Sequence, residues 1–287
     1  MEIASVLQVE CNGSGGYDSY RVPGLVTLSN GDILLYYEGR QEKTQRRVLF
    51  LRRSIDGGRS FAPREELVCP QGEELIHNPM MIAGPNGQVW FFWCQDYTRL
   101  FLRESLDNGL TFGPDRELTS AIDGFRDRWP VTLWAISPGH GLFLREGRLL
   151  IPLWLSRGEN AHLPACFACL FSDDLGNHWH CGDIVPAGNG VGDPTEASVA
   201  QRTDGTLLAT LRHEIPGVRR RAFCQGTAEA WSAPWLHPDL PDPICSGALF
   251  ALPDNRLAFA NCAWGDEAAL ERQRRGESIR WSLDARQ

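Results

Sequence analysis

Ser105-Leu106-Asp107-Asn108-Gly109-Leu110-Thr111-Phe112 is the stretch that decides the fold, because it recurs along the chain. The pattern is serine, any residue, aspartate, any residue, glycine, any residue, serine or threonine, and then an aromatic residue. Residues 54–61 repeat it in full, and residues 172–179 repeat it with histidine in place of the hydroxyl residue. Degenerate copies stand at 224–231 and, cut short, at 282–284. Self-similarity of this kind indicates a repeat architecture.

Each copy has the chemistry of a tight turn. The aspartate carboxylate accepts hydrogen bonds from nearby backbone N–H groups, and the glycine tolerates a positive φ angle. Between the copies, Asn30-Gly31, Asn86-Gly87, Asp204-Gly205 and Asp254-Asn255 each join two apolar runs, which is a strong signal for a β-hairpin. Each repeat therefore predicts several short antiparallel strands, the content of one β-propeller blade. We expect an all-β protein with a single propeller domain over residues 1–287.

The composition excludes several classes of protein. The chain has 287 residues, a net charge of −8, 10 Trp and 13 Phe, unlike a nucleic-acid binder or a disordered chain. No apolar run could span a membrane, and the start lacks a basic segment followed by an apolar one, so we expect a cytoplasmic protein. The nine cysteines are expected to be reduced, and the lone pair Cys166 and Cys169 has no second pair nearby, so neither a metal nor a cofactor is expected. The sequence contains no feature from which the oligomeric state could be inferred.

Three further motifs resemble the sialidase (neuraminidase) family, whose Asp boxes the repeated turns look like. Tyr20-Arg21-Val22-Pro23 is similar to the motif that supplies the family's first active-site arginine, and residues 137–141 and 147–152 are similar to two other stretches. The resemblance runs over almost the whole chain. It implies a six-bladed β-propeller and an exo-α-sialidase, a glycoside hydrolase that removes terminal sialic acid from glycoconjugates. Because the chain ends at Gln287, shortly after a cut-off repeat, we expect the last blade to be incomplete or missing.

The resemblance also implies three arginines that together hold the carboxylate of sialic acid. Arg21 matches the first by its motif, Arg212 matches the second, and Arg274 matches the third by spacing, with Arg275 as its competitor. A guanidinium suits this role because it stays charged and binds a carboxylate through two parallel hydrogen bonds. Since the net charge is −8, the affinity for an acidic glycan must come from these local arginines.

Other positions match catalytic and pocket residues of the family. Glu196 lies where the family has the glutamate that activates its tyrosine nucleophile. Arg40 and Asn78 match two further positions of the sugar pocket. Glu42 is the only acid near the position of the family's acid/base aspartate, and a glutamate is able to transfer a proton.

Two departures from the family pattern leave the activity open. The segment 40–47 contains no aspartate. All five tyrosines, at positions 17, 20, 36, 37 and 97, lie in the first third of the chain, whereas the family's tyrosine comes from the final blade. Three interpretations therefore remain. They are a sialidase-like hydrolase, a propeller that binds an acidic glycan without cleaving it, and a glycosidase or lyase that acts on another acidic sugar such as a uronate.

Overall fold

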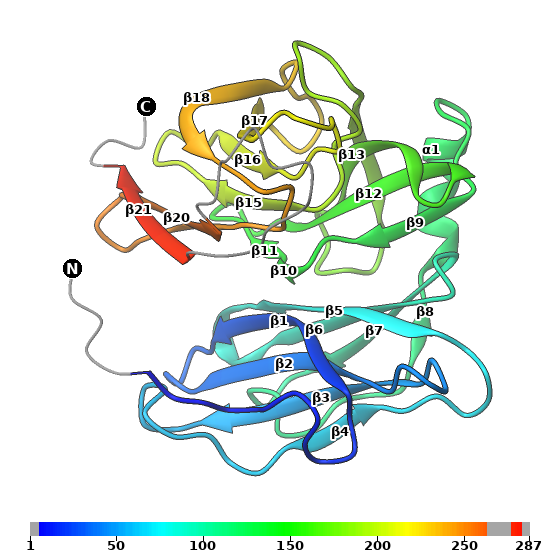
Figure 1. Cartoon of the computed structure of the whole chain (residues 1–287). Helices are drawn as coiled ribbons and strands as arrows, with labels where there is room; N and C mark the ends of the chain where they lie inside the picture. Colours follow the sequence, from blue (N-terminus) through cyan, green and yellow to red (C-terminus); the bar gives the residue numbers. More distant parts are fainter. Residues whose placement is uncertain (1–5, 263–276, 283–287) are drawn as a thin grey trace. The chain divides into compact units, whose positions relative to one another are not determined.

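β-strands make up nearly all of the regular structure in residues 6–262 and 277–282, the part of the chain that the computed structural model describes (Figure 1). The all-β prediction is therefore confirmed. The strands fall into two compact units, one ending at Leu118 and the other beginning at Thr119. A single domain over residues 1–287 stays a prediction. In the described ranges no helix is long and apolar enough to cross a membrane.

The first unit contains two antiparallel meanders of four strands each. The first meander comprises β1 (Ser19–Thr27), β2 (Ile33–Arg40), β3 (Arg47–Ser54) and β4 (Glu65–Val68). The second comprises β5 (Ile76–Ala83), β6 (Val89–Gln95), β7 (Arg99–Ser105) and β8 (Arg116–Glu117), with a short 3₁₀ helix, η1 (Pro85–Gly87), at the first turn. Alternate residues of these strands, among them Leu34, Tyr36 and Phe91, are buried in one core.

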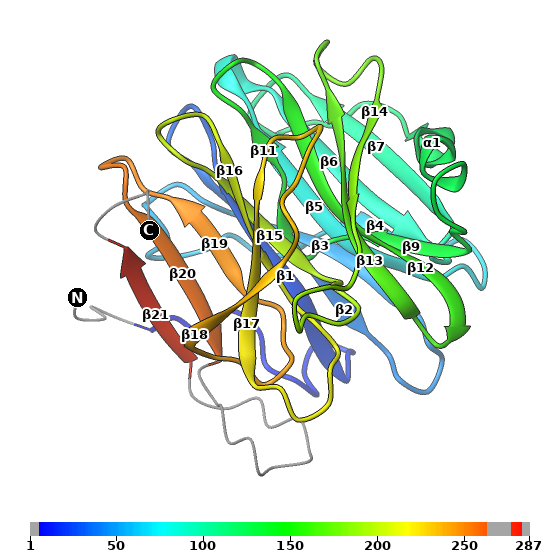
Figure 2. The ribbon, with the colours of Figure 1, turned by 90° about the horizontal axis from the view of Figure 1, so that it is seen from above.

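The second unit begins with η2 (Thr119–Ile122) and one helical turn, α1 (Asp123–Arg126). Its longest strands, β12 (Leu149–Asn160) and β13 (Leu163–Ser172), lie side by side (Figure 2). Two shorter strands, β9 (Leu133–Ile136) and β11 (Leu142–Phe143), pair with β12, and β14 (His180–Val185) pairs with β13. In the chain, β10 (Gly139–His140) comes between β9 and β11.

Two more antiparallel sheets follow in the second unit. One comprises β15 (Ala197–Gln201), β16 (Leu207–Leu211), β17 (Arg220–Gly226) and β18 (Trp235–Pro241). The other comprises β19 (Ala248–Ala251), β20 (Leu257–Cys262) and β21 (Glu277–Ser282). A four-stranded antiparallel meander has the size of one propeller blade, as the repeats predicted. The six-bladed count stays a prediction.

The repeated turns form through the predicted hydrogen bonds. In the first copy, Asp56 Oδ1 accepts the backbone N–H of Ser60 at 3.0 Å, and Asp56 Oδ2 accepts the Ser60 hydroxyl at 2.6 Å. Asp107 holds the threonine of the second copy in the same way. In the third copy the ring of His178 replaces the hydroxyl, with its Nδ1 atom 2.5 Å from Asp174 Oδ2. Because all these bonds join residues four apart, each turn is specified by its own short sequence.

Candidate functional site

A surface hollow in the first unit is lined by three arginines. Its volume is about 130 Å³. The lining residues are Ser19, Arg21, Arg40, Gln41, Glu42, Gln45 and Arg47. Three of the site residues expected from the sequence, Arg21, Arg40 and Glu42, therefore share one hollow. We call it the arginine hollow.

Strand pairing places the arginines on one face of the first meander. Arg21 of β1 pairs with Glu38 of β2, and Arg40 of β2 pairs with Arg47 of β3. Paired residues project to the same face of a sheet, as do residues two apart along one strand. After Arg21 the register shifts at a bulge, where Val22 has a φ angle of 53°. Arg21 is exposed, and its guanidinium forms neither a hydrogen bond nor an ion pair with any residue that the structure describes.

Glu38 holds the other two arginines of the hollow. Its side chain is fully buried. Its Oε2 atom accepts hydrogen bonds from Nε and Nη2 of Arg40, both at 2.6 Å, and lies 3.9 Å from Nη1 of Arg47. Its Oε1 atom accepts the backbone N–H of Asn78 in β5 at 2.6 Å. A buried carboxylate requires such partners, and in return it fixes the direction of the Arg40 guanidinium.

Asn78 is buried and is not among the residues that line the arginine hollow. Its Oδ1 atom lies 3.3 Å from Nδ1 of His77, whose Nε2 atom accepts the backbone N–H of Tyr97 at 3.1 Å. Burial lowers the pKa of His77 to about 3, so this imidazole is neutral near pH 7. In the first unit Asn78 thus contributes its backbone N–H to Glu38. A contact of its side chain with a sugar stays a prediction.

Glu42 belongs to the turn that joins β2 and β3. The backbone N–H of Gln41 donates to Arg46 O at 2.9 Å, and Gln45 Nε2 donates to Glu42 O at 2.6 Å. Gln45 closes the turn with a φ angle of 57°. The turn thus carries an acid to the edge of a cationic hollow, where a carboxyl group is able to exchange a proton with a bound molecule.

The two expected residues of the second unit contact each other. Arg212 directly follows β16, and Nη1 of this residue lies 2.8 Å from Oε2 of Glu196, which directly precedes β15. Nη2 of Arg212 lies 2.7 Å from Oε1 of Glu214. Burial acts to lower the pKa of Arg212, but the two carboxylates act to raise it, and the net result is a raised pKa. Arg212 is therefore a charged group between two carboxylates.

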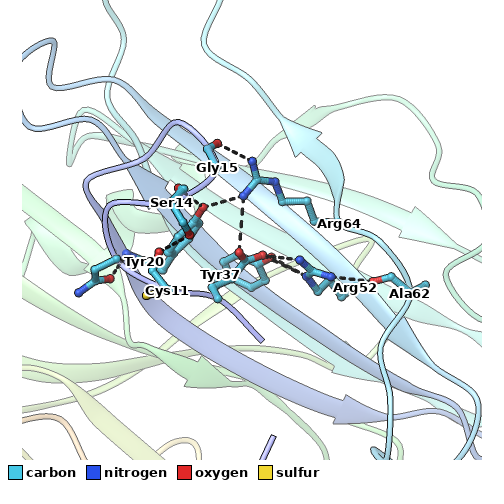
Figure 3. A network of polar contacts seen from close by, with 10 residues as sticks. Cys11, Ser14, Gly15, Tyr20, Tyr37, Arg52, Ala62 and Arg64 are labelled. Carbon is cyan, nitrogen blue, oxygen red and sulfur yellow. Dashed lines mark hydrogen bonds and ion pairs between the residues drawn. The ribbon is translucent and has the colours of Figure 1, made fainter. Parts of the chain in front are cut away.

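The first unit contains a tyrosine in contact with a glutamate, Tyr37 with Glu10, which is the combination that the resemblance implies for the nucleophile and its base. The groups around Tyr37, however, oppose its ionisation. The Tyr37 hydroxyl bonds to the Glu10 carboxylate, and both groups accept hydrogen bonds from Arg52 (Figure 3). Burial and the bond to Glu10 raise the pKa of Tyr37, which opposes ionisation of the phenol. Tyr37 precedes Glu38 in β2, so its side chain projects to the face opposite that of Glu38.

The expected site residues are divided between the two units. Arg21, Arg40, Glu42 and Asn78 lie in the first unit, and Glu196 and Arg212 lie in the second. Arg274 and its competitor Arg275 lie outside the described residues. The convergence of all these side chains on one sugar stays a prediction. The residues that the structure describes include no group of three or more His, Cys, Asp or Glu side chains that could hold a metal ion.

Three residues that organise these clusters, Glu38, Arg47 and Glu214, were not expected. A signal for Glu38 exists in the sequence, because it continues the alternating row of Leu34 and Tyr36, and an acid on a buried face needs a basic partner. Arg47 becomes recognisable only when the β2–β3 register is known. Glu214 lies two residues after the expected arginine of the second unit, a spacing that puts both side chains on one side of an extended segment.

Comparisons with known proteins agree with the repeats and the fold. The sequence model of the family described as BNR repeat-like domain matches residues 70–286. Sialidase-3 of Mus musculus is 27% identical over 266 residues, which are 80% of this chain and 62% of that protein.

Two solved structures share the fold of this chain. Hadza microbial sialidase Hz136 matches 95% of this chain and 58% of its own with a TM-score of 0.77 at 22% identity. A leech intramolecular trans-sialidase, complexed with 2,7-anhydro-Neu5Ac, matches 97% of this chain and 60% of its own with a TM-score of 0.72 at 13% identity. The chain thus spans less than two thirds of the length of each of these relatives. This chain belongs to the sialidase family with BNR, or Asp-box, repeats.

Proposed function

We propose that this chain is an exo-α-sialidase-like glycoside hydrolase that removes terminal sialic acid from glycoconjugates. The observation that carries the proposal is the arginine hollow. Arg21 has no counter-ion among the described residues, and Arg40 and Arg47 share the single carboxylate of Glu38. The four side chains together carry an excess of positive charge. A carboxylate of the substrate matches this charge, and a guanidinium binds it through two hydrogen bonds.

In this proposal the residues have separate roles. Arg21 binds the substrate carboxylate, together with Arg212 and Arg274, and Arg40 contacts the sugar. Glu42 protonates the glycosidic oxygen as the bond breaks. Glu196 acts as a base toward the nucleophile. Asn78 contributes to the sugar pocket.

A second function, binding of an acidic glycan without cleavage, is favoured by one observation. No tyrosine lines the arginine hollow, and the tyrosine that does contact a glutamate, Tyr37, has a raised pKa. A phenol that resists ionisation is a poor nucleophile. Binding and cleavage therefore need separate measurements.

The test measures hydrolysis of a fluorogenic α-sialoside and, by calorimetry, the affinity for free sialic acid. The Arg21→Ala variant is compared with Arg59→Ala, which removes an exposed arginine of the same unit that lies outside the hollow. We expect turnover and binding in the wild type and in Arg59→Ala, and the loss of both in Arg21→Ala. Binding without turnover would select the glycan-binding function. Binding of glucuronate in preference to sialic acid would select another acidic sugar, and equal affinities of the two variants would contradict the site.

A further inference from the structure

The turn that carries Glu42 is attached to a loop that precedes β1. The backbone N–H of Glu42 donates to Asp18 Oδ2 at 2.7 Å. The backbone N–H of Asp18 donates to Arg40 O at 2.9 Å, and Nε2 of Gln41 donates to Gly16 O at 3.0 Å. Three hydrogen bonds thus join residues 16–18 to residues 40–42, and only one of the three uses a carboxylate.

The loop before β1 is itself held in place. The Tyr20 hydroxyl donates to Ser14 O at 2.9 Å, and Nη2 of Arg64 donates to Gly15 O at 2.7 Å (Figure 3). The backbone N–H of Tyr20 donates to Asn12 Oδ1 at 3.0 Å, and Nη1 of Arg64 donates to the Tyr20 hydroxyl at 2.6 Å. Hydrogen bonds to Tyr20 and Arg64 thus hold the loop that precedes Asp18 in place, and Asp18 in turn bonds to the turn that carries Glu42.

We propose that Asp18 is a positioning residue that holds Glu42 at the arginine hollow. This inference rests on the proposed function, in which Glu42 is the proton donor. Asp18 does not line the hollow, whereas Glu42 and Ser19 do. An ionised carboxylate forms a stronger hydrogen bond to a backbone N–H than a neutral group does. Its bond to the N–H of Glu42 therefore restricts the backbone from which the catalytic carboxyl group projects.

The placement of Glu42 matters in one chemical step. The Glu42 carboxyl group gives its proton to the glycosidic oxygen while the bond from that oxygen to the anomeric carbon breaks. The bonding electron pair stays with the oxygen, and the aglycone leaves as a neutral alcohol. Water then supplies the hydroxyl group to the anomeric carbon and returns a proton to the Glu42 carboxylate, so the net reaction is hydrolysis. A sugar alcohol is a poor leaving group and needs this proton more than a phenol does, because a phenolate is a more stable anion.

The loss of the Asp18 carboxylate should therefore affect two substrates differently. General acid catalysis typically contributes about 10²- to 10⁴-fold in rate. A variant that leaves Glu42 in place but lets its backbone move should lose part of this factor. We expect Asp18→Ala to lower kcat for sialyllactose by about tenfold or more, and kcat for an aryl sialoside by less than about threefold. KM should change little for either substrate, because the arginines are untouched.

The experiment compares Asp18→Ala with Asp56→Ala. The second variant removes a half-buried aspartate of the same unit whose carboxylate also accepts a backbone N–H of a turn. Asp56 follows the end of β3, whereas Arg47 at the start of β3 lines the hollow and Asp56 does not. Amide hydrogen exchange is measured on peptides that cover residues 41–46, and kcat and KM are measured on both substrates. Asp18→Asn, which keeps an oxygen acceptor at the same place, should restore most of the protection and most of kcat.

A double-mutant cycle with Glu42→Gln completes the test. If Asp18 acts through Glu42, Asp18→Ala should produce no further loss of kcat in the Glu42→Gln background. Unchanged exchange of residues 41–46 in Asp18→Ala, or additive losses in the cycle, would overturn the inference. If the wild type cleaves no sialoside, the proposed hydrolase fails, and the exchange measurement alone then decides whether Asp18 holds the turn.

Discussion

Replacement of Glu38 by glutamine should destabilise the first unit strongly, because one buried carboxylate serves three partners. Glu38 is fully buried and accepts two hydrogen bonds from Arg40 and one from the backbone of Asn78, all at 2.6 Å. Glutamine keeps the size of the side chain but removes its charge, so Arg40 and Arg47 lose their shared counter-ion. A buried pair from which one partner is removed typically costs about 3–5 kcal/mol.

The expected magnitude is at the lower end of that range. Arg40 is 28% exposed and Arg47 is 14% exposed, so water partly solvates both guanidinium groups after the substitution. We therefore expect a loss of about 3 kcal/mol in the free energy of unfolding of the first unit. At an m-value of about 2 kcal/mol per molar urea, the unfolding midpoint should fall by about 1.5 M.

The assay is urea unfolding followed by hydrogen-exchange labelling of peptides from β2 and β3, which report on the first unit alone. The matched control is Glu65→Gln, since Glu65 is exposed on β4 and its carboxylate has no hydrogen bond or ion pair with a described residue. Its effect should stay within about 0.5 kcal/mol. A midpoint for Glu38→Gln equal to that of the control would refute the assignment of Glu38 as the charge that organises the hollow.

Three further predictions concern pH and the second unit. Burial lowers the pKa of His77 to about 3, so between about pH 6.5 and pH 3 the unfolded chain binds a proton that the folded chain does not. The free energy of unfolding should therefore decrease as the pH falls through this window. The difference between the urea midpoints at about pH 7 and about pH 4 should be smaller in His77→Gln than in the wild type. Hydrogen bonds within its own turn lower the pKa of Asp107 to about 2. Its contribution to the free energy of unfolding is therefore present above about pH 4 and is lost as the pH falls toward 2. In an acid titration followed by circular dichroism, Asp107→Asn should lose less stability than the wild type. Glu214→Gln should lower the melting temperature by about 3–6 °C, because Arg212 loses one of two close carboxylates. Glu159→Gln, which breaks only an exposed ion pair, should change it by less than about 1 °C, and equal shifts would contradict the prediction.

The repeated turns could be predicted from the sequence because their interactions are local. Asp56 and Asp107 bond to residues four positions later, so the eight-residue pattern contains the whole hydrogen-bonding scheme. The hairpins at Asn30-Gly31 and Asp204-Gly205 were predictable for the same reason, since Gly31 and Gly205 have φ angles of 88° and 91°. These turns mark where one strand ends and the next begins. Their sequences therefore predict the order of the strands along the chain, and this order indicates the fold class.

The partners of the site arginines could not be predicted in the same way. The contact between Glu38 and Arg47 depends on the register of β2 against β3, and a shift of one residue would send one of the two side chains to the other face. The contact between Glu38 and Asn78 joins two different sheets. Arg21 could be identified because residues 20–23 resemble a motif of the family. The carboxylates that neutralise its neighbours lie at positions that no motif includes.

The carboxylates around each arginine change what that arginine is able to do. Arg212 lies between Glu196 and Glu214, so a substrate carboxylate that approaches it meets two charges of its own sign. Arg21 forms no ion pair with a carboxylate among the residues that the structure describes. The energy of a guanidinium–carboxylate pair depends on the charges that already surround it, because each existing carboxylate both satisfies donors and repels a second anion. Recognition of an acidic sugar should therefore depend more on Arg21 than on Arg212, although the family resemblance gives both arginines the same role.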